Sequence, residues 1–382
     1  MKRCVLGLCL WLCGLLSGVY AQAAERIWPG QEWPDNKGEH INAHGGGLLF
    51  DGGKYYWYGE NRPARGFTTE VGVEVYSSTD LVNWTDEGVA LAVSEKAGSP
   101  IERGCIMERP KVVRNPKTGK YVMLFHLELK GQGYAAARVG FAESDSPTGP
   151  FRFIRSLRPN AGKWPADFSR RDIREAKALK EEDYKGWWTP AWRKAVTKGL
   201  LLARDVPGGQ MSRDMTVFVD DDGKAYHIYS AEENLTLNLA ELTEDYLDYT
   251  GKYVRIAPGG QNEAPTIFKH GGTYWLITSG CTGWEPNEAR MFKAESLWGP
   301  WEQLSSPFDG KDAEKSFHSQ GTYIFKVEGT DDGYVFMADR WNPRSLKNSR
   351  HIWLPIRFKT DGTPVIRWMD GWSPQEEFGG EG

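Results

Sequence analysis

Short apolar runs separated by glycine-containing turns recur along the chain. Five such turns, at Gly53, Gly119, Gly223, Gly272 and Gly333, are each flanked by β-branched and aromatic residues. Turns of this kind between apolar runs are the strongest short-range sign of a β-hairpin. We therefore predict paired strands at 46–50 and 55–58, 110–113 and 121–126, 215–219 and 226–229, 265–268 and 274–278, and 322–325 and 334–338.

Further apolar runs follow four of these hairpins, at 71–76, 137–144, 235–242 and 290–295. A single four-stranded unit cannot bury both of its faces, so consecutive units of this size pack against one another. Five units in a row predict an all-β fold, the five-bladed β-propeller. A sandwich of two sheets is the alternative, but it would not require five matching hairpins.

One segment interrupts the repeat, because Gly119 and Gly223 are 104 residues apart and the other turn glycines lie much closer together. The excess, at about 157–211, contains two stretches rich in helix-forming residues, 167–184 and 189–204. We predict a mostly helical insertion between blades two and three, which would form a lid or a side layer.

The N-terminus has the pattern of a secretory signal peptide. Met1-Lys2-Arg3 precede an apolar run from Cys4 to Val19, and Ala21-Gln22-Ala23-Ala24 supply small residues for cleavage. We expect a signal peptide at 1–24, a propeller domain at 25–382, and an exported protein, periplasmic or secreted. The apolar run is short for a bilayer, and no second one follows, so we expect no membrane span.

Charge and cysteine content exclude several classes of function. The formal net charge is −4 and basic residues do not cluster, which argues against a nucleic-acid partner. Cys105 and Cys281 are the cysteines outside the predicted signal peptide. They form a disulfide or remain as buried thiols, and the chain has no C-x-x-C or H-E-x-x-H zinc motif.

The chain contains 17 Trp, a high number for a globular protein. Trp and Tyr present flat apolar faces with a polar edge, which suits the C–H faces of sugars. Packing between the sheets is the alternative for most of them. In the insertion, Trp187, Trp188 and Trp192 either anchor it to the propeller or edge a sugar-binding cleft.

Polar residues occur at matching positions in all five units. In a propeller the first strand of each blade lines the central channel, so the residues heading these strands meet around one mouth. These residues are His44, Glu108, Asp214, Glu263 and Gln320. Convergent polar groups in a concave place are the default candidate for a site.

Loops between the second and third strands should lie over the same mouth. They contain Glu232 and Glu233 in blade three, Trp284 in blade four, and Arg340, Trp341 and Asn342 in blade five. Acids, Arg and Asn can form hydrogen bonds with sugar hydroxyls, and Trp can stack on sugar rings. We predict that Glu232 is the inward-facing acid of its pair and that all of these except Glu233 contact substrate.

Carboxylates and Trp at one mouth, without cofactor motifs, indicate cleavage of a glycosidic bond. That reaction requires a protonated acid beside the leaving oxygen and a group that activates or replaces water. We predict Glu263 as the acid, with the carboxylate of Asp214 raising its pKa. The expected partner is a polysaccharide or oligosaccharide.

Three phrases resemble glycoside hydrolase family 43, namely Met107-Glu108-Arg109-Pro110-Lys111-Val112, Ser212-Arg213-Asp214-Met215-Thr216 and Asn262-Glu263-Ala264-Pro265. Three more are similar to the exo-β-1,3-galactanase branch of that family, namely Ile41–Gly47, Thr282–Asn287 and Ser319–Thr322. The resemblance covers the mature chain. It implies a five-bladed propeller and hydrolysis with inversion, with Glu263 as the acid and Asp214 as the pKa modulator and positioner.

The chain departs from the family in its first blade, where Asn42-Ala43-His44-Gly45 offers no carboxylate as a base. The branch carries a Gln on the fifth blade, matched by Gln320, which would orient the water or act through an unusual tautomer. Glu108, which by resemblance holds sugar hydroxyls, and His44 are the next candidates. A single His is weak evidence for a metal, so we predict none, although His318 resembles a family His that holds a cation in the channel.

These observations predict an exo-acting, inverting hydrolase that releases galactose from β-1,3-galactan, such as the backbone of arabinogalactan. The alternatives on the same fold are an α-L-arabinofuranosidase and a β-D-galactofuranosidase. A carbohydrate-binding propeller without catalytic activity is the alternative of another class. No organic cofactor is expected.

Overall fold

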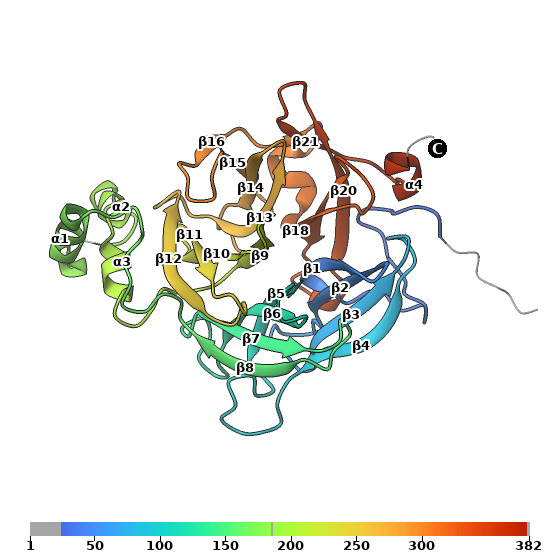
Figure 1. The fold of residues 1–382 in the computed structure, drawn as a ribbon, viewed down its shortest axis with the longest axis horizontal. Helices are drawn as coiled ribbons and strands as arrows, with labels where there is room; N and C mark the ends of the chain where they lie inside the picture. Colours follow the sequence, from blue (N-terminus) through green and yellow to red (C-terminus); the bar gives the residue numbers. More distant parts are fainter. Residues whose placement is uncertain (1–23, 185, 380–382) are drawn as a thin grey trace, which may run out of the picture.

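The strands form five separate sheets arranged around a central axis (Figure 1). The structure is a computed structural model that describes residues 24–184 and 186–379. The arrangement confirms the predicted five-bladed propeller and excludes a sandwich of two sheets. The predicted signal peptide lies almost entirely outside the described residues.

Strands follow one another from the axis outward in each blade. Blade 1 contains β1 (His44–Asp51), β2 (Lys54–Glu60), β3 (Gly72–Ser78) and β4 (Thr85–Ala92). Blade 2 contains β5 (Ile106–Arg114), β6 (Tyr121–Glu128), β7 (Arg138–Ser144) and β8 (Arg152–Leu157). Blade 3 contains β9 (Met215–Val219), β10 (Ala225–Ala231), β11 (Thr236–Leu242) and β12 (Tyr249–Ile256).

Blade 4 contains β13 (Glu263–His270), β14 (Thr273–Ser279), β15 (Arg290–Ala294) and β16 (Glu302–Leu304). Blade 5 contains β18 (Gln320–Lys326), β19 (Tyr334–Arg340), β20 (Arg350–Phe358) and β21 (Pro364–Arg367), with the short β17 (Phe308–Asp309) paired in parallel to β21. The remaining short elements are η2 (Ala313–His318), η3 (Leu346–Asn348) and α4 (Pro374–Phe378).

The hairpin between β1 and β2 shows why the turn glycines recur. Gly52 and Gly53 have φ values of +56° and +80°, a left-handed conformation that other residues adopt at a cost. Two such residues form a turn whose twist matches that of paired strands. Asp51 and Lys54 therefore pair directly across it.

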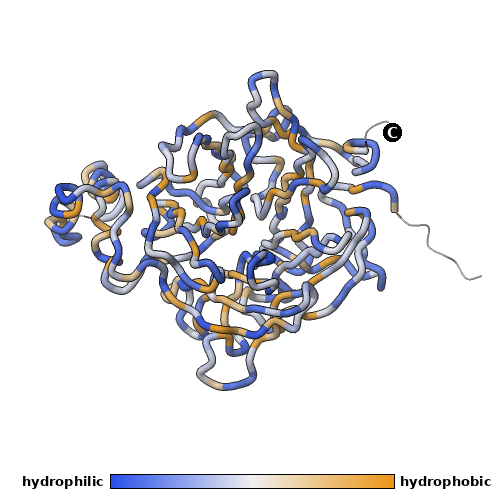
Figure 2. Tube along the Cα trace, viewed as in Figure 1, coloured by the Kyte–Doolittle hydropathy of each residue, from blue (hydrophilic) through white to orange (hydrophobic). Residues whose placement is uncertain are grey.

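Apolar side chains fill the spaces between neighbouring blades, and the backbone trace coloured by hydropathy shows apolar residues along all five blades (Figure 2). Where blade 1 meets blade 5, Trp57 is 1% exposed and packs 4.7 Å from Trp353 and 5.4 Å from Trp84, measured between ring centroids. Replacing such a residue with Ala costs about 3–5 kcal/mol. Many of the tryptophans are therefore core residues.

The ring is closed by the N-terminal segment, which packs on the last blade. Ile27 and Trp372 exchange two backbone hydrogen bonds, of 2.8 and 3.0 Å. Within the described residues, no helix is long and apolar enough to cross a bilayer. Cys105 and Cys281 are both free thiols, so the disulfide alternative is wrong.

The insertion contains α1 (Arg170–Ala178), η1 (Glu181–Asp183), α2 (Pro190–Thr197) and α3 (Leu200–Asp205). Ser169 and Thr189 cap α1 and α2 through their side chains, as start signals of this kind predict. The helices lie beside blade 3, outside β12, and not over the channel (Figure 1). The insertion is thus a side layer rather than a lid.

Trp192 is a core residue of the insertion. It is 1% exposed and stacks on Trp187 with 5.3 Å between ring centroids. Trp187 and Trp188, between η1 and α2, are about half exposed. They do not edge the cavity described below.

Candidate active site

A cavity of about 330 Å³ opens at the mouth of the channel, where the inner strands begin. Its lining includes six of the predicted site residues, Glu108, Asp214, Glu263, Trp284, Gln320 and Trp341. The other lining residues are Arg62, Arg109, His126, Tyr134, Arg213, Asn234 and Gly283. Residues far apart in the sequence are thus brought to one concave place.

Glu263 is the first residue of β13, so its side chain stands at the channel mouth. Asn234 donates a hydrogen bond of 2.7 Å to its Oε1. Burial, followed by the negative charge of Asp214, raises the pKa of Glu263 to about 7. A carboxyl group with this pKa is protonated in a large share of molecules near neutral pH, as a general acid requires.

Asp214 lies just before β9 and faces Glu263 from the neighbouring blade. Its Oδ2 accepts hydrogen bonds from Arg109 Nη2 at 2.9 Å and from the backbone N–H of Ala264 at 3.0 Å. Because Ala264 follows Glu263 directly, this contact fixes the two carboxyl groups relative to each other. Asp214 is therefore placed to influence the protonation of Glu263.

Gln320, the first residue of β18, is held by three hydrogen bonds. Its Oε1 accepts from Arg109 Nη2 at 2.6 Å and from Trp341 Nε1 at 3.0 Å, and its Nε2 donates to Ser279 Oγ at 3.0 Å. Two N–H donors on one atom identify that atom as the amide oxygen. Both acceptor positions of the oxygen are in use.

Glu108 is a carboxylate surrounded by donors. Arg62 Nη2 and Tyr134 Oη donate to its Oε1 at 2.9 Å, and His126 Nδ1 lies 3.1 Å from its Oε2. Burial alone would raise the pKa of Glu108, but Arg62 and His126 hold it well below its usual range. Glu108 is therefore an ionised acceptor, suited to holding hydroxyl groups and weak as a base.

Comparison with known proteins identifies the family. Residues 164–364, more than half of the chain, match the model of glycosyl hydrolases family 43. The chain belongs to this family. A curated relative, the β-D-galactofuranosidase xynD of Aspergillus niger, is 28% identical over 141 residues, and the alignment spans 36% of this chain and 40% of that protein.

Solved structures of family 43 are similar over most of the chain. A β-1,3-galactosidase determined with galactodeoxynojirimycin is 60% identical, with a TM-score of 0.88 and coverage of 91% of this chain and 100% of that one. The exo-β-1,3-galactanase of Clostridium thermocellum is 35% identical, with a TM-score of 0.73 and coverage of 91% and 66%. That of Phanerochaete chrysosporium, with β-1,3-galactotriose, is 31% identical, with a TM-score of 0.72 and coverage of 92% and 68%.

Glu232 does not face the cavity of this family 43 protein, and our prediction for it is wrong. Its side chain is fully buried, and its two oxygens accept from Arg255 Nε and Nη2, both at 2.7 Å. Glu232, Glu233 and Asn234 all have positive φ values, from 52° to 63°. This unusual run turns Glu232 away from the mouth and brings Asn234 to Glu263 instead.

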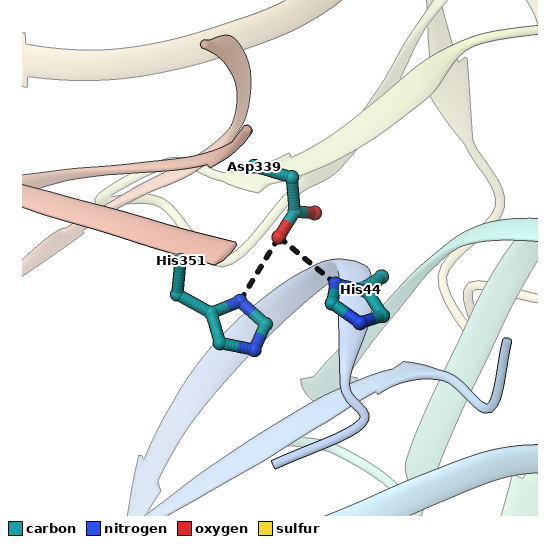
Figure 3. A group of neighbouring side chains, drawn as sticks. All are labelled: His44, Asp339 and His351. Atoms are coloured by element: carbon teal, nitrogen blue, oxygen red, sulfur yellow. Dashed lines mark hydrogen bonds and ion pairs between the residues drawn. The ribbon is translucent and has the colours of Figure 1, made fainter. Parts of the chain in front are cut away.

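His44 heads β1 as predicted but cannot reach a substrate, because it is 0% exposed. Its Nδ1 lies 3.2 Å from Asp339 Oδ1, and His351 Nδ1 lies 2.9 Å from the same oxygen (Figure 3). The backbone N–H of Gly45 donates to the other oxygen at 2.6 Å. The predictions of His44 as a base and as a substrate contact are therefore wrong, since it belongs to a buried cluster joining blades 1 and 5.

Arg340 and Asn342 also lie away from the cavity, so both predictions of substrate contact are corrected. Arg340 donates to the carbonyl of Phe317 at 2.8 Å and lies over the ring of Trp368. Arg340 ends β19 and lines a different hollow, with Phe317 and Trp368, whereas Trp341 follows the strand and lines the cavity. Asn342 instead stabilises a turn, accepting from Arg344 N at 3.2 Å.

His318 is partly exposed, and its Nε2 lies 3.8 Å from Asp312 Oδ1, outside the cavity. In the described part of the chain, two groups bring three metal-ligand atoms within 4.8 Å of one another, His44–Asp339–His351 and Glu108–His126–Asp214. In both groups His nitrogens lie against carboxylate oxygens at 2.9–3.2 Å. Each of these contacts is an imidazole–carboxylate pair.

Several lining residues were missed by the sequence analysis. Arg109 and Arg213 adjoin the predicted Glu108 and Asp214, so the same phrases contain a signal for them. Asn234 ends the loop in which Glu232 was preferred. Arg62, His126 and Tyr134 have no comparable signal, because loops and second strands bring them to the mouth.

Proposed function

We propose that this protein is an exo-acting β-1,3-galactosidase that releases galactose from β-1,3-galactan with inversion of configuration. The observation that carries the proposal is a partly buried carboxyl group, Glu263, whose pKa is raised to about 7 by burial and by Asp214. The small cavity around it suits one terminal sugar residue. The similar solved enzymes act on β-1,3-galactosides.

In the proposed mechanism, Glu263 donates its proton to the oxygen of the leaving sugar as the glycosidic bond breaks. Asp214 keeps the pKa of Glu263 high and holds its backbone in place through Ala264 N. Water attacks the anomeric carbon from the opposite face, which inverts its configuration, and the proton that this water loses passes to solvent. Glu108 accepts hydrogen bonds from sugar hydroxyls.

Gln320 is proposed to orient the attacking water. Its amide oxygen already accepts from Arg109 and Trp341, and a proton added there would face the Arg109 guanidinium. This arrangement disfavours removal of a proton by the oxygen. The second N–H of Nε2 is not used in the contact with Ser279 and can hold a water molecule.

Export is part of the proposal, since galactans are large extracellular polymers. The charged start, apolar run and Ala21–Ala24 segment support cleavage near residue 24. N-terminal sequencing of the protein recovered from the producing cells would identify the cleavage site. A mature chain that still begins at Met1 would contradict export by this route.

A furanosidase is the second candidate, because the Aspergillus niger relative is a β-D-galactofuranosidase. The test is to incubate the protein separately with β-1,3-galactan, arabinan and aryl furanosides and to identify the sugar released. Free galactose from β-1,3-galactan alone supports the proposal. Arabinose from arabinan, or hydrolysis of the furanosides alone, would overturn it.

A matched variant separates an enzyme from a sugar-binding protein. Glu263→Gln retains the size of the side chain and removes its acidic proton. An enzyme loses most of its turnover on galactan and retains binding, whereas a binding protein has no turnover to lose.

A further inference from the structure

Two aromatic side chains beside the cavity are exposed. The proposed mechanism does not use either ring as a surface on which a sugar stacks. Phe67, from the loop between β2 and β3, is 46% exposed, and Tyr134, from the loop between β6 and β7, is 40% exposed. Their rings are stacked, with 6.4 Å between centroids and 26° between planes. Isolated exposed apolar residues are common, but these two form a continuous surface.

This pair is tied to the cavity by hydrogen bonds. Tyr134 lines the cavity and donates its Oη to Glu108 at 2.9 Å. Arg62, which also lines the cavity, donates Nη1 to the carbonyl of Phe67 at 3.3 Å. The position of the Phe67 loop is therefore linked to the same residues that hold Glu108.

Below the residues that line the cavity, the side chain of Lys111 is buried among the inner strands. Lys111 is 1% exposed, and its Nζ donates to the carbonyls of Gly45 at 2.9 Å and of Arg109 at 3.2 Å. In the proposed exo-acting mode, a chain whose terminal sugar fills the cavity leaves through the mouth. Apolar surfaces on the rim are then the candidates for contact with the leaving part of the substrate.

We propose that Phe67 and Tyr134 form a stacking platform for a galactosyl residue of the leaving chain. This inference rests on the proposed function and adds a second rim contact to Trp284, which is 45% exposed and packs edge-on against Trp341 at 5.7 Å. Trp284 belongs to blade 4, the blade of Glu263, whereas Phe67 and Tyr134 belong to blades 1 and 2. The two surfaces contact different parts of the leaving chain.

The test compares substrates that share the terminal galactose but differ in what leaves. β-1,3-Galactotriose has a leaving disaccharide, and β-D-galactosyl fluoride has no leaving sugar. For Phe67→Ala we expect kcat/KM on galactotriose to fall about three- to tenfold, the size of one aromatic stacking contact. On galactosyl fluoride we expect kcat/KM of Phe67→Ala to stay within about twofold of the wild-type value, because no leaving sugar is present to stack on the ring.

Two variants serve as controls. Trp187→Ala removes an aromatic residue of equal exposure from the side layer and should leave both substrates unaffected. Phe67→Tyr keeps a stacking ring and should retain most of the activity on galactotriose.

Equal losses on both substrates for Phe67→Ala, or no loss on either, would overturn the platform while leaving the proposed function intact. If the wild-type protein released no galactose from either substrate, the proposed function itself would be wrong, and with it the proposal that a galactosyl residue stacks on Phe67 and Tyr134.

Discussion

Asp214→Asn tests whether the charge of Asp214 sets the acid strength of Glu263. Asn is nearly isosteric, and its oxygen can still accept from Ala264 N, which the carboxylate contacts at 3.0 Å. The substitution thus removes the charge and keeps the shape. Glu263 must be protonated to act, so activity falls as pH rises through its pKa of about 7.

The size of the effect follows from Coulomb's law. Two charges about 6 Å apart at an effective dielectric constant of about 20 interact by about 3 kcal/mol, or about two pKa units. Arg109, which lies 2.9 Å from Asp214, lowers the pKa of Glu263 and remains in the variant, so we expect the full fall of about two pKa units. Without Asp214, the alkaline limb of the pH profile should therefore move to lower pH.

The assay is kcat/KM on β-1,3-galactobiose from about pH 4 to 9, a range that brackets a carboxyl group shifted by burial. Asp309→Asn, an exposed carboxylate of blade 5 paired with Arg367, is the matched control and should leave the profile unchanged. An alkaline limb that stays in place in Asp214→Asn, or moves to higher pH, would refute the reasoning.

Three further predictions concern single residues. Glu263→Gln should lower kcat on galactobiose by about 10²–10⁴-fold and have much less effect on galactosyl fluoride, whose leaving group needs little protonation; equal losses on both would argue against an acid role. Gln320→Ala should reduce kcat by about 10²-fold, because the attacking water would no longer be oriented. Full activity of this variant would exclude Gln320 from the water-orienting role. Glu232→Ala should destabilise the fold by about 3–5 kcal/mol in urea unfolding, because Arg255 would be left buried and unpaired. At temperatures where Glu232→Ala stays folded, its kcat should match that of the wild type, and a lower kcat at unchanged stability would return Glu232 to the site.

The fold could be predicted from the sequence because its signals are local and repeated. Each hairpin needs a turn with left-handed residues, as at Gly52 and Gly53, and apolar runs on either side. The position of Glu263 follows from the same repeat, since a residue that heads an inner strand lies at the mouth. Asp214 and Gln320 were found by this rule.

The direction of individual side chains could not be predicted in this way. Glu232 and Asn234 are two residues apart in one loop. Their placement depends on positive φ values at three consecutive residues, 232–234, which no turn motif in the sequence predicts. His44 occupies the same strand position as Glu263, yet partners from blade 5, Asp339 and His351, surround it. Such contacts between distant segments decide which polar residues reach the cavity.

The central claim is that this family 43 protein releases terminal galactose with inversion. The most direct measurement is proton NMR of β-1,3-galactan during the first minutes of hydrolysis, before the released sugar equilibrates between its anomers. We expect α-galactose to appear first, as the early product. β-Galactose appearing first, internal cleavage into longer oligosaccharides, or a released sugar other than galactose would contradict it.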